Sequence, residues 1–240
     1  MGTPVNKWFI AYRGIGETDW KPIEPPKGTY QADPFLFERD GITYLFYEDY
    51  DYDKGVISYS ILGNTITPAK RVLVRPYHLS FPCIFEENNE IWMIPETGRA
   101  NRIELYRAKQ FPDEWEFVKV LVENVCASDV VYKKNHLYTT VDGDHKPRIY
   151  SGSLLGEWRL TRAWEAMNSR PAGHILEENG RLVIPTQDGE KSYGRAIIFR
   201  DLETWKELRR IEPDWYPNLI GCHTYNKTDK FEVTDGKLKL

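Results

Sequence analysis

The stretch ADPFLF at residues 32–37, a turn at Asp40 and Gly41, and the stretch TYLFYE at residues 43–48 decide the fold of this chain. Aromatic and apolar residues fill both stretches, and an Asp-Gly pair between two such runs is typical of a β-hairpin. The pattern therefore predicts two short antiparallel strands, the second of which ends on the carboxylate of Glu48.

The same hairpin pattern recurs along the chain at a nearly constant interval. Residues 80–96 repeat it with SFPCIF, a turn and IWMIPE, so that Glu48 and Glu96 are 48 positions apart. Residues 129–142 and 173–187 carry the third and fourth copies, and a third strand-like run follows each hairpin. A fourth run opens near a tryptophan, at Trp115, Trp158 and Trp205. Four strand-like runs in units of about 44–49 residues are typical of propeller blades.

The two ends of the chain carry the parts of one more unit. Residues 223–225 and 231–235 resemble the first two strands of a blade, and residues 8–12 and 20–23 resemble its third and fourth. We therefore expect an all-β fold, a five-bladed β-propeller with four strands per blade, as a single domain over residues 1–240. Its last blade would be closed by N- and C-terminal strands. A β-sandwich with regular hairpins is the alternative, but it gives no reason for the two ends to complete one pattern.

Composition narrows the class of protein. The net charge of -4 and the pI of about 5.8 argue against a general nucleic-acid binder, which usually carries a basic face. No stretch reaches the roughly 20 apolar residues of a membrane span, and the N-terminus lacks the apolar core of a signal peptide, so a cytoplasmic protein is expected. The three cysteines, Cys83, Cys126 and Cys222, form neither a disulfide framework nor a zinc motif.

Polar residues recur at the end of the second strand in all five predicted units. These equivalent positions hold Glu48, Glu96, Asp142, Gln187 and Asp235. Strand ends meet solvent in any fold, which is the alternative explanation. Because inner-strand side chains of a propeller alternate between the core and the central channel, the recurrence favours a funnel lined with hydrogen-bonding groups.

Further candidates lie near the start of the first strand of each unit. Asp33 and Asp129 stand at its head in the first and third units, and His174 and His223 share the position two residues further along in the fourth and fifth. His78 precedes the first strand of the second unit. A lone His is more often structural than functional, but two at one repeat position beside acidic residues favour a site.

Residues 32–34, Ala-Asp-Pro, resemble the five-bladed propellers of the furanosidase and invertase superfamily, which includes glycoside hydrolase families 43 and 32. Other motifs are more closely similar to the propeller domain N-terminal to the transferase domain of plant glucosamine inositolphosphorylceramide transferases, also found in bacterial proteins beside sugar-modifying domains. These motifs are HLSFP at 78–82, IPE at 94–96, ELYRA at 104–108, FPDEW at 111–115 and RPAG at 170–173. The similarity spans nearly the whole chain, and it predicts the fold better than the activity.

The hydrolase resemblance implies three carboxylates: an Asp in the first blade as base or nucleophile, an Asp in the third that tunes and orients, and a Glu in the fourth as general acid. Asp33 and Asp129 match the first two by position. The third is missing, because residues 172–174 are Ala-Gly-His. Glycoside cleavage needs a group that protonates the leaving oxygen. We assign that role to Glu96, with Glu48 as the alternative, if burial raises the pKa of the carboxyl. His174 is a further candidate.

The first functional hypothesis is a glycoside hydrolase-like enzyme with Asp33, Asp129 and Glu96 as catalytic residues. The residues expected to bind its glycan are Glu48, His78, Trp92, Asp142, His174, Gln187 and His223. No cofactor and no metal site is expected, although His223 and Asp235 are compatible with a cation on the propeller axis.

The second hypothesis is a non-catalytic carbohydrate-binding propeller that assists a partner glycosyltransferase or sugar-modifying enzyme. Trp92, Tyr47 and Tyr50 would then offer stacking surfaces to a sugar, and the acidic residues would bind its hydroxyls. A protein-interaction scaffold is a third option, and it would need an exposed apolar patch.

Overall fold

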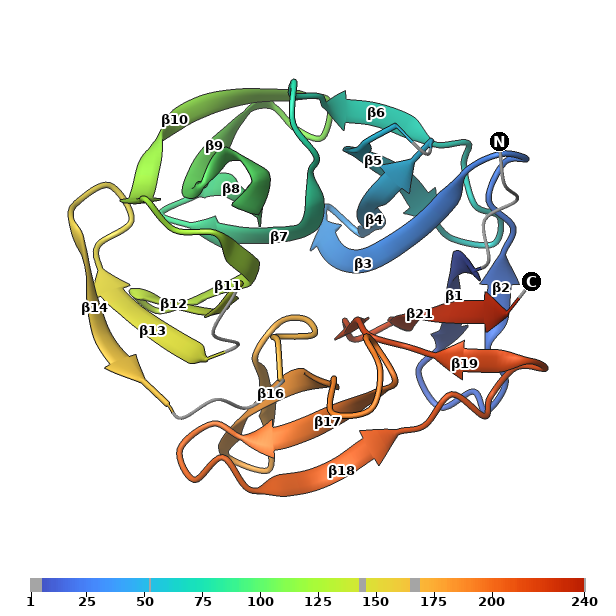
Figure 1. Cartoon of the computed structure of the whole chain (residues 1–240). Helices are drawn as coiled ribbons and strands as arrows, with labels where there is room; N and C mark the ends of the chain where they lie inside the picture. The colour runs from blue at the N-terminus through green and yellow to red at the C-terminus, as the bar shows by residue number, and fades with distance from the viewer. Residues whose placement is uncertain (1–5, 52, 143–145, 165–168, 240) are drawn as a thin grey trace.

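The computed structural model describes residues 6–51, 53–142, 146–164 and 169–239. Five antiparallel sheets stand in a ring around a central axis (Figure 1). Within the described residues the only helix is a short 3-10 turn, η1 (Gly98–Ala100). The prediction of an all-β, five-bladed propeller is therefore confirmed.

Each of the first four blades is a meander whose four strands follow one another in the chain. The first blade consists of β3 (Tyr30–Arg39), β4 (Ile42–Tyr50), β5 (Gly55–Leu62) and β6 (Lys70–Leu73). The second consists of β7 (Ser80–Glu87), β8 (Glu90–Glu96), β9 (Arg102–Gln110) and β10 (Glu114–Glu123). The third consists of β11 (Ala127–Lys133), β12 (His136–Val141), β13 (Pro147–Gly152) and β14 (Trp158–Ala163). The fourth consists of β15 (Leu176–Glu178), β16 (Arg181–Asp188), β17 (Ala196–Asp201) and β18 (Glu207–Ile211).

The fifth blade joins the two ends of the chain, as the sequence predicted. β1 (Asn6–Gly14) lies between β21 (Phe231–Lys239) and β2 (Lys21–Ile23). Two short strands, β19 (Leu219–Gly221) and β20 (Tyr225–Lys227), pair with the other edge of β21. The long antiparallel ladder between β1 and β21 satisfies backbone groups that an open ring would expose, and it closes the propeller.

The start of the fourth blade departs from the predicted pattern. Its inner strand begins only at Leu176, because Gly173 has φ +140° and a Cβ there would lie 1.9 Å from the carbonyl oxygen of Tyr225. The backbone of the fifth blade passes too close for any side chain at this position. Trp205 likewise precedes β18 rather than opening it, since it adopts φ +62° in the turn before that strand.

The inner strands of the first three blades share a β-bulge near their start. The bulges contain Asp33, Phe81 and Asp129, which lie 48 positions apart and have φ of 53°, 44° and 56°. Non-glycine residues rarely adopt this left-handed conformation, and a bulge removes backbone groups from the ladder. Three backbone N–H groups thereby become available to side chains of neighbouring blades.

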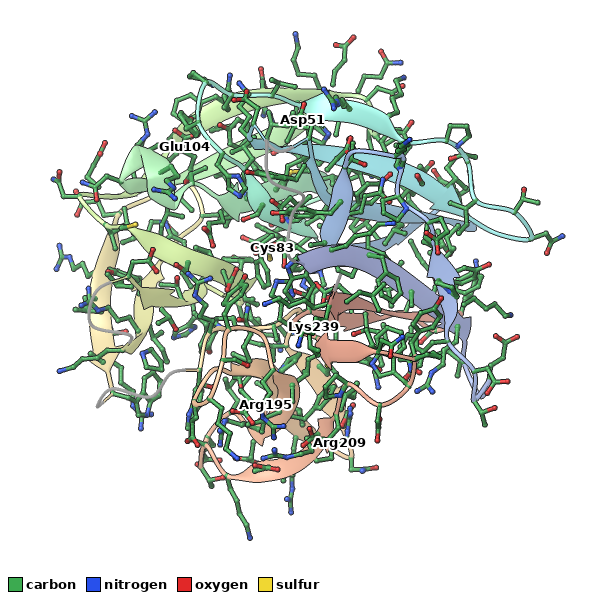
Figure 2. The ribbon with its side chains drawn as sticks, turned by 45° about the vertical axis from the view of Figure 1, so that its right-hand side comes forward. Asp51, Cys83, Glu104, Arg195, Arg209 and Lys239 are labelled. Atoms are coloured by element: carbon green, nitrogen blue, oxygen red, sulfur yellow. The ribbon has the colours of Figure 1, made fainter. Side chains whose placement is uncertain are left out.

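Apolar side chains fill the space between blades. Phe35 of the first blade and Phe81 of the second are both fully buried, and their rings meet edge to face at 4.7 Å. Cys83 is buried in this interior, whereas Arg195 and Arg209 of the fourth blade are half-buried and exposed, respectively (Figure 2). All three cysteines are unpaired thiols. In the part of the chain that the structure describes, no helix is long and apolar enough to cross a membrane.

Candidate functional site

A cavity of about 730 Å³ opens among the first three blades. This volume is within the range of small-molecule sites in proteins. The residues that line the cavity include Tyr30, Tyr50, His78, Glu96, Arg99, Asp142 and Arg170. They combine aromatic rings with groups of both charges, and they come from strand ends and from the segments that join strands.

One wall of the cavity is aromatic. Tyr30 and Tyr50 are cross-strand partners on β3 and β4, and their rings stack at 4.5 Å. The ring of His78 meets Tyr50 at 5.8 Å, close to edge-on. Flat rings at the side of a polar cavity suit the apolar face of a sugar, whose hydroxyls then reach the surrounding polar groups.

His78 is held in one tautomer. The backbone N–H of Gly55 donates to its Nδ1 at 2.9 Å, so the proton of the neutral ring is on Nε2. Nε2 lies 3.2 Å from Oε1 of Glu48. Burial lowers the pKa of His78, and the positive charge of Arg99 acts in the same direction, against the charge of Glu96.

Glu48 lies behind His78 and is only 5% exposed. Although its Oε1 is close to His78 Nε2, the approach is too poorly directed for a hydrogen bond, so that buried oxygen lacks a hydrogen-bond partner. Burial, with the nearby carboxylates of Asp33 and Glu96, raises the pKa of Glu48 well above its ordinary value. Glu48 therefore keeps its proton to a higher pH than an exposed glutamate does.

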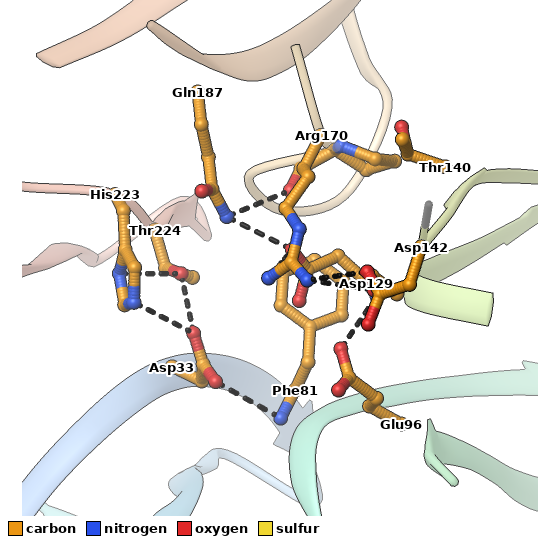
Figure 3. Close-up of polar contacts among 12 residues, drawn as sticks. Asp33, Phe81, Glu96, Asp129, Thr140, Asp142, Arg170, Gln187, His223 and Thr224 are labelled. Atoms are coloured by element: carbon orange, nitrogen blue, oxygen red, sulfur yellow. Dashed lines mark hydrogen bonds and ion pairs between the residues drawn. The ribbon is translucent and has the colours of Figure 1, made fainter. Parts of the chain in front are cut away.

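Asp33 is 4% exposed and is not among the described residues that line the cavity. Its Oδ1 accepts the hydroxyl of Thr224 at 2.7 Å, and its Oδ2 accepts the backbone N–H of Phe81 at 3.2 Å (Figure 3). Burial raises the pKa of Asp33 to about 6, with the charge of His223 opposing the rise and that of Asp235 adding to it. Both oxygens of Asp33 thus join neighbouring blades.

Asp129 is in a similar position, 3% exposed. Its N–H donates to Oε2 of Glu96 at 2.9 Å, and its own Oδ2 accepts the side-chain amide of Gln187 at 2.9 Å. Nη1 of Arg170 lies 3.5 Å from the same oxygen. Burial raises the pKa of Asp129 in spite of this cation. The second, third and fourth blades meet in these contacts (Figure 3).

Arg170, which sequence reasoning did not single out, is the central cation of the site (Figure 3). Its Nη2 donates to Ser128 Oγ at 2.7 Å and to Asp142 Oδ1 at 3.1 Å. Burial alone would raise the pKa of Asp142, but hydrogen bonds from Ser128 and Arg170 lower it. The signal in the sequence was the RPAG motif at residues 170–173, which was interpreted as a mark of the family and not of the site.

His223 forms a second buried group with two carboxylates. Its Nδ1 lies 2.5 Å from Asp235 Oδ2, its Nε2 lies 3.8 Å from Asp33 Oδ1, and its ring stacks on Trp8 at 4.0 Å. Burial opposes protonation of His223, yet Asp235 and Asp33 raise its pKa. Asp33, His223 and Asp235 also have the spacing of a metal site. Because their donor atoms already bind one another, Thr224 and Phe81, we assign no ion to them.

The structure gathers most of the predicted site residues but not all. The polar groups around the axis include six of the predicted residues: Asp33, Glu96, Asp129, Asp142, Gln187 and His223. Glu48 and His78 adjoin them. Of the three predicted catalytic residues, Glu96 alone appears among the described residues that line the cavity. The catalytic roles of all three stay predictions.

Three aromatic or imidazole candidates lie elsewhere. Trp92 is 2% exposed in the core, and its Nε1 donates to the carbonyl oxygen of Glu87. Tyr47 is equally buried, with its hydroxyl on Ser60. His174 meets the edge of Phe35, and burial lowers its pKa to about 4, so it is neutral at physiological pH. The structure therefore does not bring these three rings to the cavity.

The sequence profile of the family described as "Glucosamine inositolphosphorylceramide transferase 1, N-terminal" matches residues 23–214 of this chain. Glucosamine inositolphosphorylceramide transferase 1 of Arabidopsis thaliana is 28% identical over 206 residues, which cover 76% of this chain and 27% of that protein. The protein of the same name from Oryza sativa subsp. indica is 29% identical over 228 residues, 85% of this chain and 30% of that protein. The chain spans less than a third of the length of these curated relatives.

Solved structures that match this fold include glycoside hydrolases. A family 117 glycoside hydrolase of Zobellia galactanivorans matches with a TM-score of 0.61 at 11% identity, over 97% of this chain and 92% of that chain. An exo-beta-1,3-galactanase of Phanerochaete chrysosporium matches with a TM-score of 0.57 at 10% identity, over 86% of this chain and 54% of that chain. At such identities the likeness shows the fold alone. Because the family profile covers well over half of its residues, this propeller belongs to the family of glucosamine inositolphosphorylceramide transferase 1 N-terminal domains.

Proposed function

We propose that this propeller binds a glycan in the cavity among its first three blades and holds it for a partner enzyme, without cleaving it. One observation carries the proposal: the two aspartates that match hydrolase positions, Asp33 and Asp129, are almost fully buried and are hydrogen-bonded to neighbouring blades. A base or nucleophile must reach its substrate, whereas neither carboxylate is among the described residues that line the cavity.

The groups that do line the cavity suit binding. Glu96 and Asp142 are acceptors for sugar hydroxyls, and the guanidinium groups of Arg99 and Arg170 are donors. The rings of Tyr50 and His78 lie on the aromatic side of the cavity, against which a sugar face would pack. A few convergent polar groups beside an aromatic surface are what orients a small ligand in a protein pocket.

The proposal extends to a partner transferase. The curated relatives are named glucosamine inositolphosphorylceramide transferases, and this chain corresponds to less than a third of their length. A domain that holds a glycan near a separate transferase domain raises the local concentration of that glycan at the transferase. This role requires no catalytic group in the propeller itself.

Cleavage of a glycosidic bond is the second candidate. The observation in its favour is that Asp33, Asp129 and Glu96 lie in one region around the axis (Figure 3), and that Glu48 is close enough for their charges to act on it. Hydrolysis uses one protonated and one ionised carboxyl, and Glu48 is buried whereas Glu96 is half-buried. In this mechanism Glu96 or Glu48 is the acid and Asp33 the base.

A panel of aryl glycosides and oligosaccharides distinguishes the two candidates. Glycan binding without turnover by the wild-type protein, weakened at least about tenfold in Glu96→Gln, supports the binding proposal. Glu157→Gln is the matched control, because the Glu157 side chain is 87% exposed and is absent from the lining of the cavity. Turnover that disappears in both Asp33→Asn and Glu96→Gln would establish hydrolysis instead. If no glycan binds or reacts, both candidates are wrong.

A further inference from the structure

The ring of His78, in the cavity wall, contacts two strands of the first blade. Gly55, the first residue of β5, donates its N–H to Nδ1 at 2.9 Å, and Glu48 of β4 places Oε1 3.2 Å from Nε2. The first contact requires an unprotonated Nδ1. Only the neutral ring with its proton on Nε2 is compatible with both neighbours.

The backbone at Gly55 is packed closely around this ring. A Cβ on Gly55 would lie 2.4 Å from the carbonyl oxygen of Leu79 and 2.8 Å from both Glu48 Oε1 and His78 Cε1. The N–H of Leu79 also donates to the carbonyl oxygen of Gly55 at 3.0 Å. The His78 ring therefore has little room to change its contacts unless the start of β5 or the segment before β7 moves.

Charged and titratable groups face His78 from several elements. Glu48 and Tyr50 belong to β4, Glu96 ends β8, and Arg99 lies in η1. Lys54 is adjacent to Gly55, and its Nζ donates to the carbonyl oxygen of Arg75 at 2.7 Å. Of these groups Glu96 favours a charged imidazole, whereas Arg99 and burial disfavour it.

We propose that His78 is a pH-dependent latch on the cavity wall: the neutral ring holds the start of β5, and a second proton, which must go to Nδ1, releases Gly55 and opens the wall. A protonated Nδ1 and the Gly55 N–H are both donors, so they cannot remain 2.9 Å apart in a hydrogen bond. The consequence for glycan affinity rests on the proposed function; the latch itself does not.

Nuclear magnetic resonance of the ¹⁵N-labelled full chain tests the latch without any ligand. The expected result is a neutral His78 with its proton on Nε2, and a Gly55 amide resonance that moves with the same midpoint as the His78 ring. Below that midpoint the hydrogen-exchange protection factor of Gly55 should fall by about tenfold. A neutral ring protonated on Nδ1, or a His78 titration that leaves Gly55 unchanged, would overturn the proposal.

Variants separate His78 from its neighbours. His78→Asn places a carbonyl oxygen near the position of Nδ1 and cannot titrate, so the Gly55 amide should become insensitive to pH. His136→Asn is the control, since the half-buried His136 on β12 contacts its own turn at Lys134. Glu48→Gln keeps a side chain of the same shape beside Nε2 but cannot titrate. If the Gly55 titration vanishes in Glu48→Gln, Glu48 is the titrating group and the latch is wrong. If His78→Asn does not fold, the wild-type titration decides alone.

Affinity for a glycan identified in the binding panel then tests the link to the cavity. The wild-type protein should bind at least about tenfold more weakly below the His78 midpoint than above it, and His78→Asn should bind equally at both. Equal wild-type affinity on both sides would show that the latch does not control the cavity. If no glycan binds at any pH, the proposed function fails, and the magnetic resonance result still judges the latch.

Discussion

The carboxylate of Asp33 accepts the backbone N–H of Phe81 at 3.2 Å, so a side chain of the first blade holds the bulged backbone of the second. The same relationship occurs at two other blade boundaries. Asp235 accepts the N–H of Asp33, and Glu96 accepts the N–H of Asp129. Each donor lies at a bulge with positive φ, where the N–H has left the ladder. These carboxylates therefore stabilise the ring in addition to any contact with a ligand.

Replacing Asp33 should destabilise the propeller. Asp33→Ala leaves the Phe81 N–H and the Thr224 hydroxyl without their acceptor, and each buried unsatisfied donor costs about 1–3 kcal/mol. We expect the free energy of unfolding in urea to fall by about 2 kcal/mol or more. Asp33→Asn keeps one acceptor oxygen and tolerates the left-handed backbone, so it should lose less. An alanine variant as stable as the wild type would contradict the bridging role.

Stability should depend on pH through Asp33. Burial raises its pKa from 3.8 to about 6, so the folded chain holds a proton that the unfolded chain has already released. The stabilisation is complete below pH 3.8 and is lost as the pH rises through about 6. We measure the free energy of unfolding of the wild type and of Asp33→Asn across this window. The value for the wild type, relative to that for Asp33→Asn, should decrease as the pH rises. A difference that stays constant with pH would refute it.

Arg170 should contribute to both stability and binding. Arg170→Met keeps the apolar stem but removes the counter-charge of Asp129 and Asp142. The Arg170 side chain is 21% exposed, so we expect a loss of roughly 1–3 kcal/mol, between the values for exposed and for buried pairs. Arg159→Met is the control, because that side chain is 82% exposed and its pair with Glu157 should contribute little. Equal losses of unfolding free energy for Arg170→Met and Arg159→Met in chemical unfolding would contradict this role of Arg170.

Gly173 should be irreplaceable at the junction of the fourth and fifth blades. Gly173→Ala places a Cβ 1.9 Å from the Tyr225 carbonyl oxygen in a backbone conformation with φ +140°. We expect a loss of at least about 2 kcal/mol from strain and overpacking combined. Gly63→Ala is the comparison, since its nearest neighbour is an oxygen 3.8 Å away. Thermal unfolding at the same midpoint for both variants would disprove the close-packing argument.

The sequence identified more of the fold than of the site, for a physical reason. Strands of one blade pair mainly with their neighbours in the chain, so apolar runs, turns and a 48-residue interval predict the blades directly. The alternation of side chains along an inner strand does not distinguish the face toward the funnel from the face that packs between blades. Trp92 illustrates this limit, because its position was read as a binding surface and the ring is buried in the core.

By itself, then, the sequence determined the number of blades, the closure of the ring by its two ends, and the recurrence of carboxylates at equivalent positions. Only the tertiary structure decided what those carboxylates contact. Asp33 and Thr224 are 191 positions apart, and Arg170 and Ser128 are 42 apart, yet each pair is hydrogen-bonded. Such contacts depend on the angles at which blades meet, and no local pattern of residues encodes the partner of a side chain that crosses a blade boundary.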